Sequence, residues 1–106
     1  MAKRIYIAGK ISGLPEPVFM YKFRAAERLF QSLGWDVVNP TTLPHNHDKS
    51  WSSYMLEDLN ALAQCDACYF MADWVDSPGA KIEHAFAVRA GKQIIYQNVE
   101  KEVVNG

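Results

Sequence analysis

The feature of this sequence that most limits its fold is a series of short apolar runs that do not alternate with polar residues. These runs cover residues 5–9, 35–38, 67–71 and 93–96. Continuous apolar runs of this length are typical of strands buried on both faces of a sheet. Between the runs lie segments with helical spacing, at residues 19–33, 51–64 and 80–90, and Ser50 can cap the second of these helices. The alternation predicts an α/β domain of three layers, in which helices cover both faces of a parallel sheet of four or five strands.

Length and charge limit the possible functions further. The chain has 106 residues, which leaves too little material for two separate cores, so we expect one domain over residues 1–106. The formal net charge of −1 lacks the basic excess of proteins that bind nucleic-acid polymers. No apolar run approaches the roughly 20 residues of a membrane-spanning helix, and no signal peptide is evident. We therefore expect a cytoplasmic protein without nucleic-acid or membrane partners.

Parallel sheets of this kind bind ligands at the carboxyl ends of their strands. In this chain those ends lead into the loops at residues 9–13, 39–50 and 73–79. The sequence therefore predicts a site where these three loops meet.

Two acids stand on the apolar arcs of their predicted helices. Asp58 falls among Met55, Leu59 and Leu62. Glu83 falls within the apolar arc of the next helix, which is formed by Ile82, Phe86, Ala87 and Ala90. Each has a structural interpretation, because Asp58 can form hydrogen bonds with loop backbone and Glu83 can interact favourably with the positive end of the helix dipole. A pair of acids beside one cleft is also what acid–base and nucleophilic glycosyl chemistry requires. We expect free N–H groups at the helix start to keep Glu83 ionised, which favours it as the nucleophile.

Several short motifs together resemble one family. They are Tyr6-Ile7-Ala8-Gly9 with Ser12-Gly13, Glu57-Asp58-Leu59, Asp66-Ala67, and Ser77-Pro78-Gly79-Ala80-Lys81-Ile82-Glu83. In combination the sequence resembles the nucleoside 2-deoxyribosyltransferase-like superfamily, in its small bacterial and phage branch near the deoxynucleoside 5′-monophosphate N-glycosidases. The resemblance implies a Rossmann-like (flavodoxin-like) fold and cleavage or transfer at the N-glycosidic bond of a deoxyribonucleoside or its 5′-monophosphate.

The resemblance also implies roles for individual residues. Glu83 attacks the anomeric carbon to form a covalent glycosyl-enzyme, Asp58 handles the base and its proton, and Tyr6 positions the nucleophile. Ser77 replaces the Asp of the deoxyribosyltransferases proper, and the serine favours a 5′-monophosphate. The substrate is a small nucleoside or nucleotide, and no metal or redox cofactor is implied.

Other residues are candidates for substrate binding. Glycine loops let backbone amides approach an anion closely, a helix start favours negative charge, and an aromatic ring can stack on a nucleobase. On these grounds we expect the binding residues to be Gly9, Lys10, Ser12, Gly13, Gly79 and Trp74. Packing in the core or at an interface is an equal alternative for Trp74. Asn98 and Asn105 are the candidates for a C-terminal Asn that some family members lend to a neighbouring subunit.

Two further motifs suggest chemistry but have simpler interpretations. His45-Asn46-His47-Asp48 offers metal ligands, yet no third ligand stands at helical spacing nearby, so we expect solvated side chains and no metal site. Cys65 and Cys68 form a Cys-x-x-Cys pair, but the pair straddles a helix end and a strand rather than opening a helix. We expect buried, reduced thiols, and a thiol-redox function is the least favoured interpretation.

The helix over residues 51–64 has an apolar arc wider than one sheet face covers. Trp51, Tyr54 and Met55 widen it, which predicts a homodimer or a larger homo-oligomer. Two functional interpretations stay open: an N-glycosidase or deoxyribosyltransferase-like enzyme, and a non-catalytic nucleotide-binding or sensing module. An acid aimed at the anomeric carbon favours the enzyme.

Overall fold

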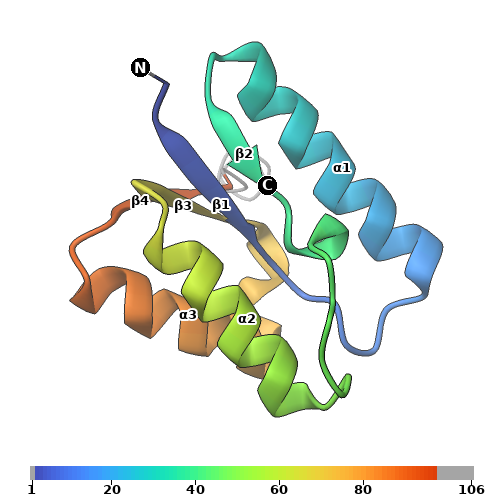
Figure 1. The fold of residues 1–106 in the computed structure, drawn as a ribbon. Coiled ribbons are helices and arrows are strands. Elements are labelled where there is room, and N and C mark those ends of the chain that lie inside the picture. Colours follow the sequence, from blue (N-terminus) through green and yellow to red (C-terminus); the bar gives the residue numbers. More distant parts are fainter. Residues whose placement is uncertain (1, 98–106) are drawn as a thin grey trace, which may run out of the picture.

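A computed structural model describes residues 2–97 of the chain (Figure 1). The strands are β1 (Arg4–Ala8), β2 (Asp36–Val38), β3 (Ala67–Phe70) and β4 (Gln93–Tyr96). The helices are α1 (Glu16–Ser32), α2 (Trp51–Ala63) and α3 (Pro78–Arg89). Two short 3-10 helices, η1 (Pro40–Thr42) and η2 (Ala72–Asp76), lie within predicted loops.

The four strands form one parallel sheet in the order β2-β1-β3-β4. Helix α1 covers one face, and α2 and α3 lie together on the other (Figure 1). The predicted three-layer α/β architecture with a parallel sheet is confirmed. The chain turns away to opposite sides after β1 and β3, so the crevice at the carboxyl end of this strand pair is the expected place for a ligand.

Strand β1 lies in the centre of the sheet and supplies both cores. Ile5 and Ile7 pack with the α1 side chains Phe23 and Phe30. Successive side chains of a strand point to opposite faces, so the alternate β1 residues, including Tyr6, belong to the core formed with α2 and α3. This alternation directs the Tyr6 hydroxyl toward the two helices that carry Asp58 and Glu83.

The helix starts follow local capping chemistry. Ser50 caps α2 as predicted, with its side chain accepting a hydrogen bond from the Ser53 N–H. Helix α3 begins at Pro78, two residues before the predicted start, because Ser77 caps it and proline suits the first helical position. Glu83 is consequently the sixth residue of α3 and lies beyond its first turn. Ile82 is 41% exposed and does not share the buried face of Glu83 and Ala87, contrary to the helical-wheel prediction.

Among residues 2–97, no helix combines the length and the apolar composition needed to cross a bilayer.

Candidate functional site

A cavity of about 520 Å³ opens at the carboxyl end of β1, between the segments that follow β2 and β3. Its size lies within the usual range for small-molecule sites, about 300–1,000 Å³. The predicted loops after β1, β2 and β3 all contribute to its wall, together with α1, α2 and α3. Of the predicted site residues, those that line it are Tyr6, Gly9, Ser12, Asp58, Ser77, Gly79 and Glu83.

Tyr6 and Glu83 form a buried pair in the cavity wall. The Tyr6 hydroxyl donates a hydrogen bond to Glu83 Oε2 at 2.7 Å, across 77 residues of sequence. Tyr6 is fully buried and Glu83 is 5% exposed. Burial and the adjacent Glu83 carboxylate raise the pKa of Tyr6 well above its usual value, so the hydroxyl keeps its proton and acts as the donor. The pair therefore fixes the orientation of the Glu83 carboxyl group.

The protonation of Glu83 differs from the sequence-based expectation. We expected N–H groups at the helix start to hold the carboxylate ionised, but Glu83 lies too far into α3 for this. Burial instead raises the pKa of Glu83 to about 8; the Tyr6 hydrogen bond opposes this rise and the Asp58 charge adds to it. At neutral pH the group is therefore mostly protonated in the free protein.

Asp58 faces the same cavity from α2. Its Oδ1 atom is buried and has no hydrogen-bond partner among the described residues. Burial is the main cause that raises the pKa of Asp58 to about 7. A buried polar atom without a partner costs free energy, so this oxygen is a natural point for a ligand to bind.

Ser77 and Gly79 lie at the start of α3. Ser77 Oγ accepts a hydrogen bond from the Ala80 N–H at 3.1 Å, which leaves the Ser77 O–H able to donate into the cavity. Gly79 has a packing reason for being glycine, because a Cβ atom there would lie 3.1 Å from Met55 Sδ. Pro78 has no N–H to offer an anion.

Some residues of the loop after β1 line the cavity, and others have only structural roles. Gly9 and Ser12 line the cavity, whereas Lys10 and Gly13 do not. The Lys10 backbone N–H instead donates to Asp73 Oδ1 at 3.0 Å. Gly9 also has a structural role, because a Cβ atom there would lie 2.5 Å from Met71 Cε.

Trp74 does not line the cavity. Its ring stacks on His84, with centroids 4.2 Å apart, and packs against Phe70 at 5.5 Å. His84 in turn shares a 2.6 Å hydrogen bond with the Tyr96 hydroxyl, so it is not simply a surface residue. Of the two interpretations of Trp74, the structure supports packing.

Sequence reasoning missed much of the cavity wall, which comes from residues that look like ordinary helix or loop positions. These are mainly Phe19, Met20, Pro40, Thr41, His45, Trp51, Tyr54 and Met55. Their aromatic and apolar character suits a flat heterocyclic ring. The ionisable lining residues besides the two tyrosines are three acids, Glu16, Asp58 and Glu83, and one histidine, and the described lining has no Lys or Arg.

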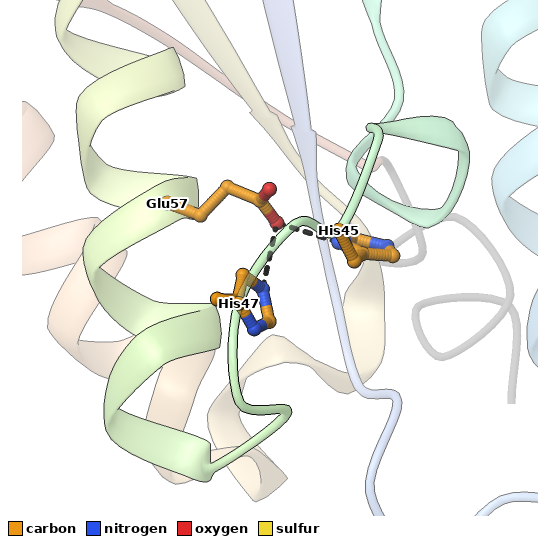
Figure 2. A group of neighbouring side chains, drawn as sticks. All are labelled: His45, His47 and Glu57. Carbon is orange, nitrogen blue, oxygen red and sulfur yellow. Dashed lines mark hydrogen bonds and ion pairs between the residues drawn. The ribbon is translucent and has the colours of Figure 1, made fainter.

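His45 and His47 are not free in solvent. His45 Nδ1 lies 2.6 Å from Glu57 Oε1, and His47 Nε2 lies 3.4 Å from the same oxygen. Figure 2 shows both rings pointing from the loop toward this α2 carboxylate. Glu57 occupies the polar side of α2, and the loop folds back over this side, which the sequence of the helix does not indicate.

Cys65 and Cys68 are free, buried thiols, as predicted. Burial raises the pKa of Cys65 to about 11 and that of Cys68 well above its usual value. Neither has the lowered pKa of a reactive cysteine, so a thiol-redox function gains no support.

The apolar arc of α2 is largely used within the chain. Met55 is buried and Tyr54 is half-buried, while Trp51 stays 53% exposed. The predicted homo-oligomer therefore depends on fewer exposed side chains than the sequence indicated. Asn98 and Asn105 lie outside the described residues.

The sequence was compared with known proteins. No curated protein matches the chain. Residues 3–96 match a family described as a domain of unknown function, DUF4406, and the chain belongs to that family.

Proposed function

We propose that this DUF4406 domain cleaves or transfers the N-glycosidic bond of a deoxyribonucleoside through a covalent intermediate on Glu83. One observation carries the proposal: a buried carboxyl group, held by a tyrosine hydroxyl at 2.7 Å, faces a cavity that is also lined by a second acid, one oxygen of which has no partner among residues 2–97. The resemblance to the nucleoside 2-deoxyribosyltransferase-like superfamily supports the same chemistry.

The reaction has two steps. In the first, ionised Glu83 attacks C1′ of the sugar, the bond from C1′ to the base nitrogen breaks, and its electron pair leaves with the base. Asp58 donates a proton to the departing base. In the second, water attacks C1′, Asp58 takes the proton of that water, and free Glu83 and the sugar are released. If a second base attacks instead, the product is a new nucleoside.

Each residue suits its role for a physical reason. Tyr6 donates to the Glu83 carboxylate and so stabilises its ionised form, which opposes the effect of burial. Asp58 Oδ1 has no donor among the described residues, and with a pKa raised to about 7 by burial, about half of the Asp58 carboxyl groups keep their proton at neutral pH. The reactive form carries its charge on Glu83 and its proton on Asp58. Because burial raises the pKa of Glu83 to about 8 and that of Asp58 only to about 7, this form is a minor fraction of the free protein at neutral pH.

Charge favours an uncharged nucleoside over its 5′-monophosphate. The described cavity lining has three acids and no Lys or Arg, whereas a phosphate dianion needs cationic or multiple N–H donors. Near the start of α3, Ser77 and Gly79 offer two neutral donors, which is too few to balance the charge of a phosphate dianion. The proposal therefore departs from the 5′-monophosphate that Ser77 suggested in the sequence.

The test is chromatography of the four deoxynucleosides and the four 5′-monophosphates after incubation with the protein, with and without an acceptor base. We expect free or exchanged base from a deoxynucleoside, and loss of at least about 10³-fold in rate for Glu83→Gln, because the nucleophile is removed. Monophosphates that react faster than nucleosides would overturn the substrate preference. Activity that survives in Glu83→Gln would overturn the mechanism.

A non-catalytic binding module is the second candidate. The observation that favours it is the raised pKa of Glu83, because a protonated carboxyl group can donate a hydrogen bond to a bound base or sugar. In that case no base is released, while nucleosides raise the melting temperature of the wild type and not of Glu83→Ala.

A further inference from the structure

We propose that His45, His47 and Glu57 bind a divalent transition-metal ion of the zinc class at the rim of the cavity. One ligand atom of each residue lies within 4.8 Å of the other two. The two histidines come from the loop before α2 and the glutamate from α2 itself (Figure 2). This proposal is independent of the proposed function.

The donor set fits this class of ion. Two imidazole nitrogens and one carboxylate oxygen form a donor set typical of Zn²⁺, whereas Mg²⁺ and Ca²⁺ favour oxygen ligands. Zinc bonds of about 2.0–2.1 Å at a tetrahedral angle place two ligand atoms about 3.3 Å apart. The distance from His47 Nε2 to Glu57 Oε1 is already 3.4 Å. The distance from His45 Nδ1 to the same oxygen is 2.6 Å and must widen.

The surroundings hold the three ligands in a partly protected position. Their side chains are 24%, 16% and 21% exposed for His45, His47 and Glu57. The Tyr54 ring contacts both imidazoles edge-on, with centroids 5.0 and 4.6 Å away. Asp48, which stands beside His47 in sequence, accepts from the Ser50 N–H and the Ser53 hydroxyl, so it serves the start of α2 instead.

One contact must change when the ion binds. The Lys49 N–H donates to His47 Nδ1 at 3.0 Å, so in the described state the His47 proton is on Nε2, facing Glu57. A neutral imidazole that binds metal through Nε2 carries its proton on Nδ1, and the Lys49 N–H must then turn away. Metal binding therefore predicts a tautomer exchange at His47 that a simple histidine–glutamate ion pair does not.

The ion would join the loop to α2 next to the cavity. His45 lines the cavity, and Glu57 adjoins Asp58, which also lines it. Three protein ligands leave one tetrahedral position for water or a ligand atom, as in zinc sites that are not purely structural. Metal binding at this point would hold the cavity wall in a fixed conformation.

The experiment is a Zn²⁺ titration of the tag-free, reduced protein in competition with a chromophoric chelator. We expect one ion per chain, and at least about tenfold weaker binding for His47→Ala and for Glu57→Gln. The matched control is His84→Phe, which removes a histidine elsewhere while keeping a ring against Trp74; we expect it to bind like the wild type. Circular dichroism establishes that each variant is folded.

Two further measurements distinguish this site from zinc binding at the cysteines and from a metal-free ion pair. Co²⁺ bound here gives visible absorption without the near-ultraviolet thiolate bands that binding at Cys65 and Cys68 would produce. Nitrogen-15 shifts of the histidine rings should show the His47 proton move to Nδ1 when Zn²⁺ is added. No competition with the chelator, equal binding by wild type and His47→Ala, or thiolate bands with Co²⁺ would each overturn the proposal.

Discussion

The acids inside the cavity differ from the acids around it in how many partners they have. Glu83 has one side-chain hydrogen bond, from Tyr6, and Asp58 Oδ1 has none among the described residues. At the rim, Asp73 accepts from the Lys10 N–H and pairs with Lys22, and Glu57 lies against two histidines. The difference indicates that the rim acids hold loops in place, whereas the cavity acids are placed at a cost to stability and are available to a ligand.

Among the variants that test this difference, we expect the largest effect from replacing Asp58. We expect Asp58→Asn to lower kcat/KM for a deoxynucleoside by about 10²–10³-fold, because general acid catalysis typically contributes this much. The unfolding free energy at neutral pH should stay the same or rise, since the variant replaces a carboxyl group whose ionised form is disfavoured by burial with a neutral amide of the same shape. Steady-state kinetics and urea unfolding of the same samples measure both. A variant that unfolds while the remaining folded protein is fully active would show that Asp58 is structural.

The second prediction concerns pH and the stability of the fold. The folded pKa of Glu83, about 8, lies above its unfolded value of 4.5, so the protonated form is the one that folding favours. The stabilisation is fully present below about pH 4.5 and is lost as pH rises toward and through 8, by at most about 5 kcal/mol. Urea unfolding between pH 5 and pH 9 should show this loss in the wild type and a smaller loss in Glu83→Gln. Parallel curves for the two proteins would contradict it.

The hydrogen bond within the cavity gives a smaller effect. Tyr6→Phe removes the hydroxyl that donates to Glu83, and we expect kcat to fall about tenfold with KM nearly unchanged. The pH at which activity rises should also move upward, because the donor no longer stabilises the Glu83 carboxylate. A purely structural Tyr6 would leave the pH profile in place.

The smallest expected effect lies at the rim. Asp73→Asn should lower the unfolding free energy by about 1 kcal/mol, because Lys22 loses an ion-pair partner that is only partly buried. Activity should stay within a few-fold of the wild type, since Asp73 does not line the cavity. Together with Asp58→Asn this variant forms a reciprocal pair, one affecting activity and the other stability. A large loss of activity in Asp73→Asn would remove the distinction between the two groups.

Much of the fold was predictable because its signals are local. The continuous apolar runs gave the four strands, and Ser50 marked the start of α2 by the capping chemistry that the structure contains. The start of α3 carried an equally local signal in Ser77-Pro78, although the apolar period alone placed it two residues too late. Asp58 and Glu83 were found because an acid on an apolar arc conflicts with the helical pattern.

What could not be predicted depends on how the loops fold back. Glu57 occupies the polar side of α2, and nothing in its own helix indicates that two loop histidines cover it. Trp74 follows β3, and its place in the sequence predicts a position near the site, but η2 turns its ring toward His84. The raised pKa of Glu83 also arises from tertiary burial, which overrides the effect of helix position.

The central place of β1 has a consequence for how the chain folds during synthesis. Its first residues pair with β2 and then with β3, and the Arg4 N–H bonds to an Asp66 oxygen 62 residues later. Because a parallel sheet has no hairpins, β1 is synthesised well before β3, and neither core can close until β3 has been made. The pair formed by Tyr6 and Glu83 spans 77 residues, so it assembles only after α3 has emerged. Slow translation between β1 and β3 would therefore prolong exposure of the apolar residues of β1, and chaperone binding to nascent chains is expected to end once β3 is available.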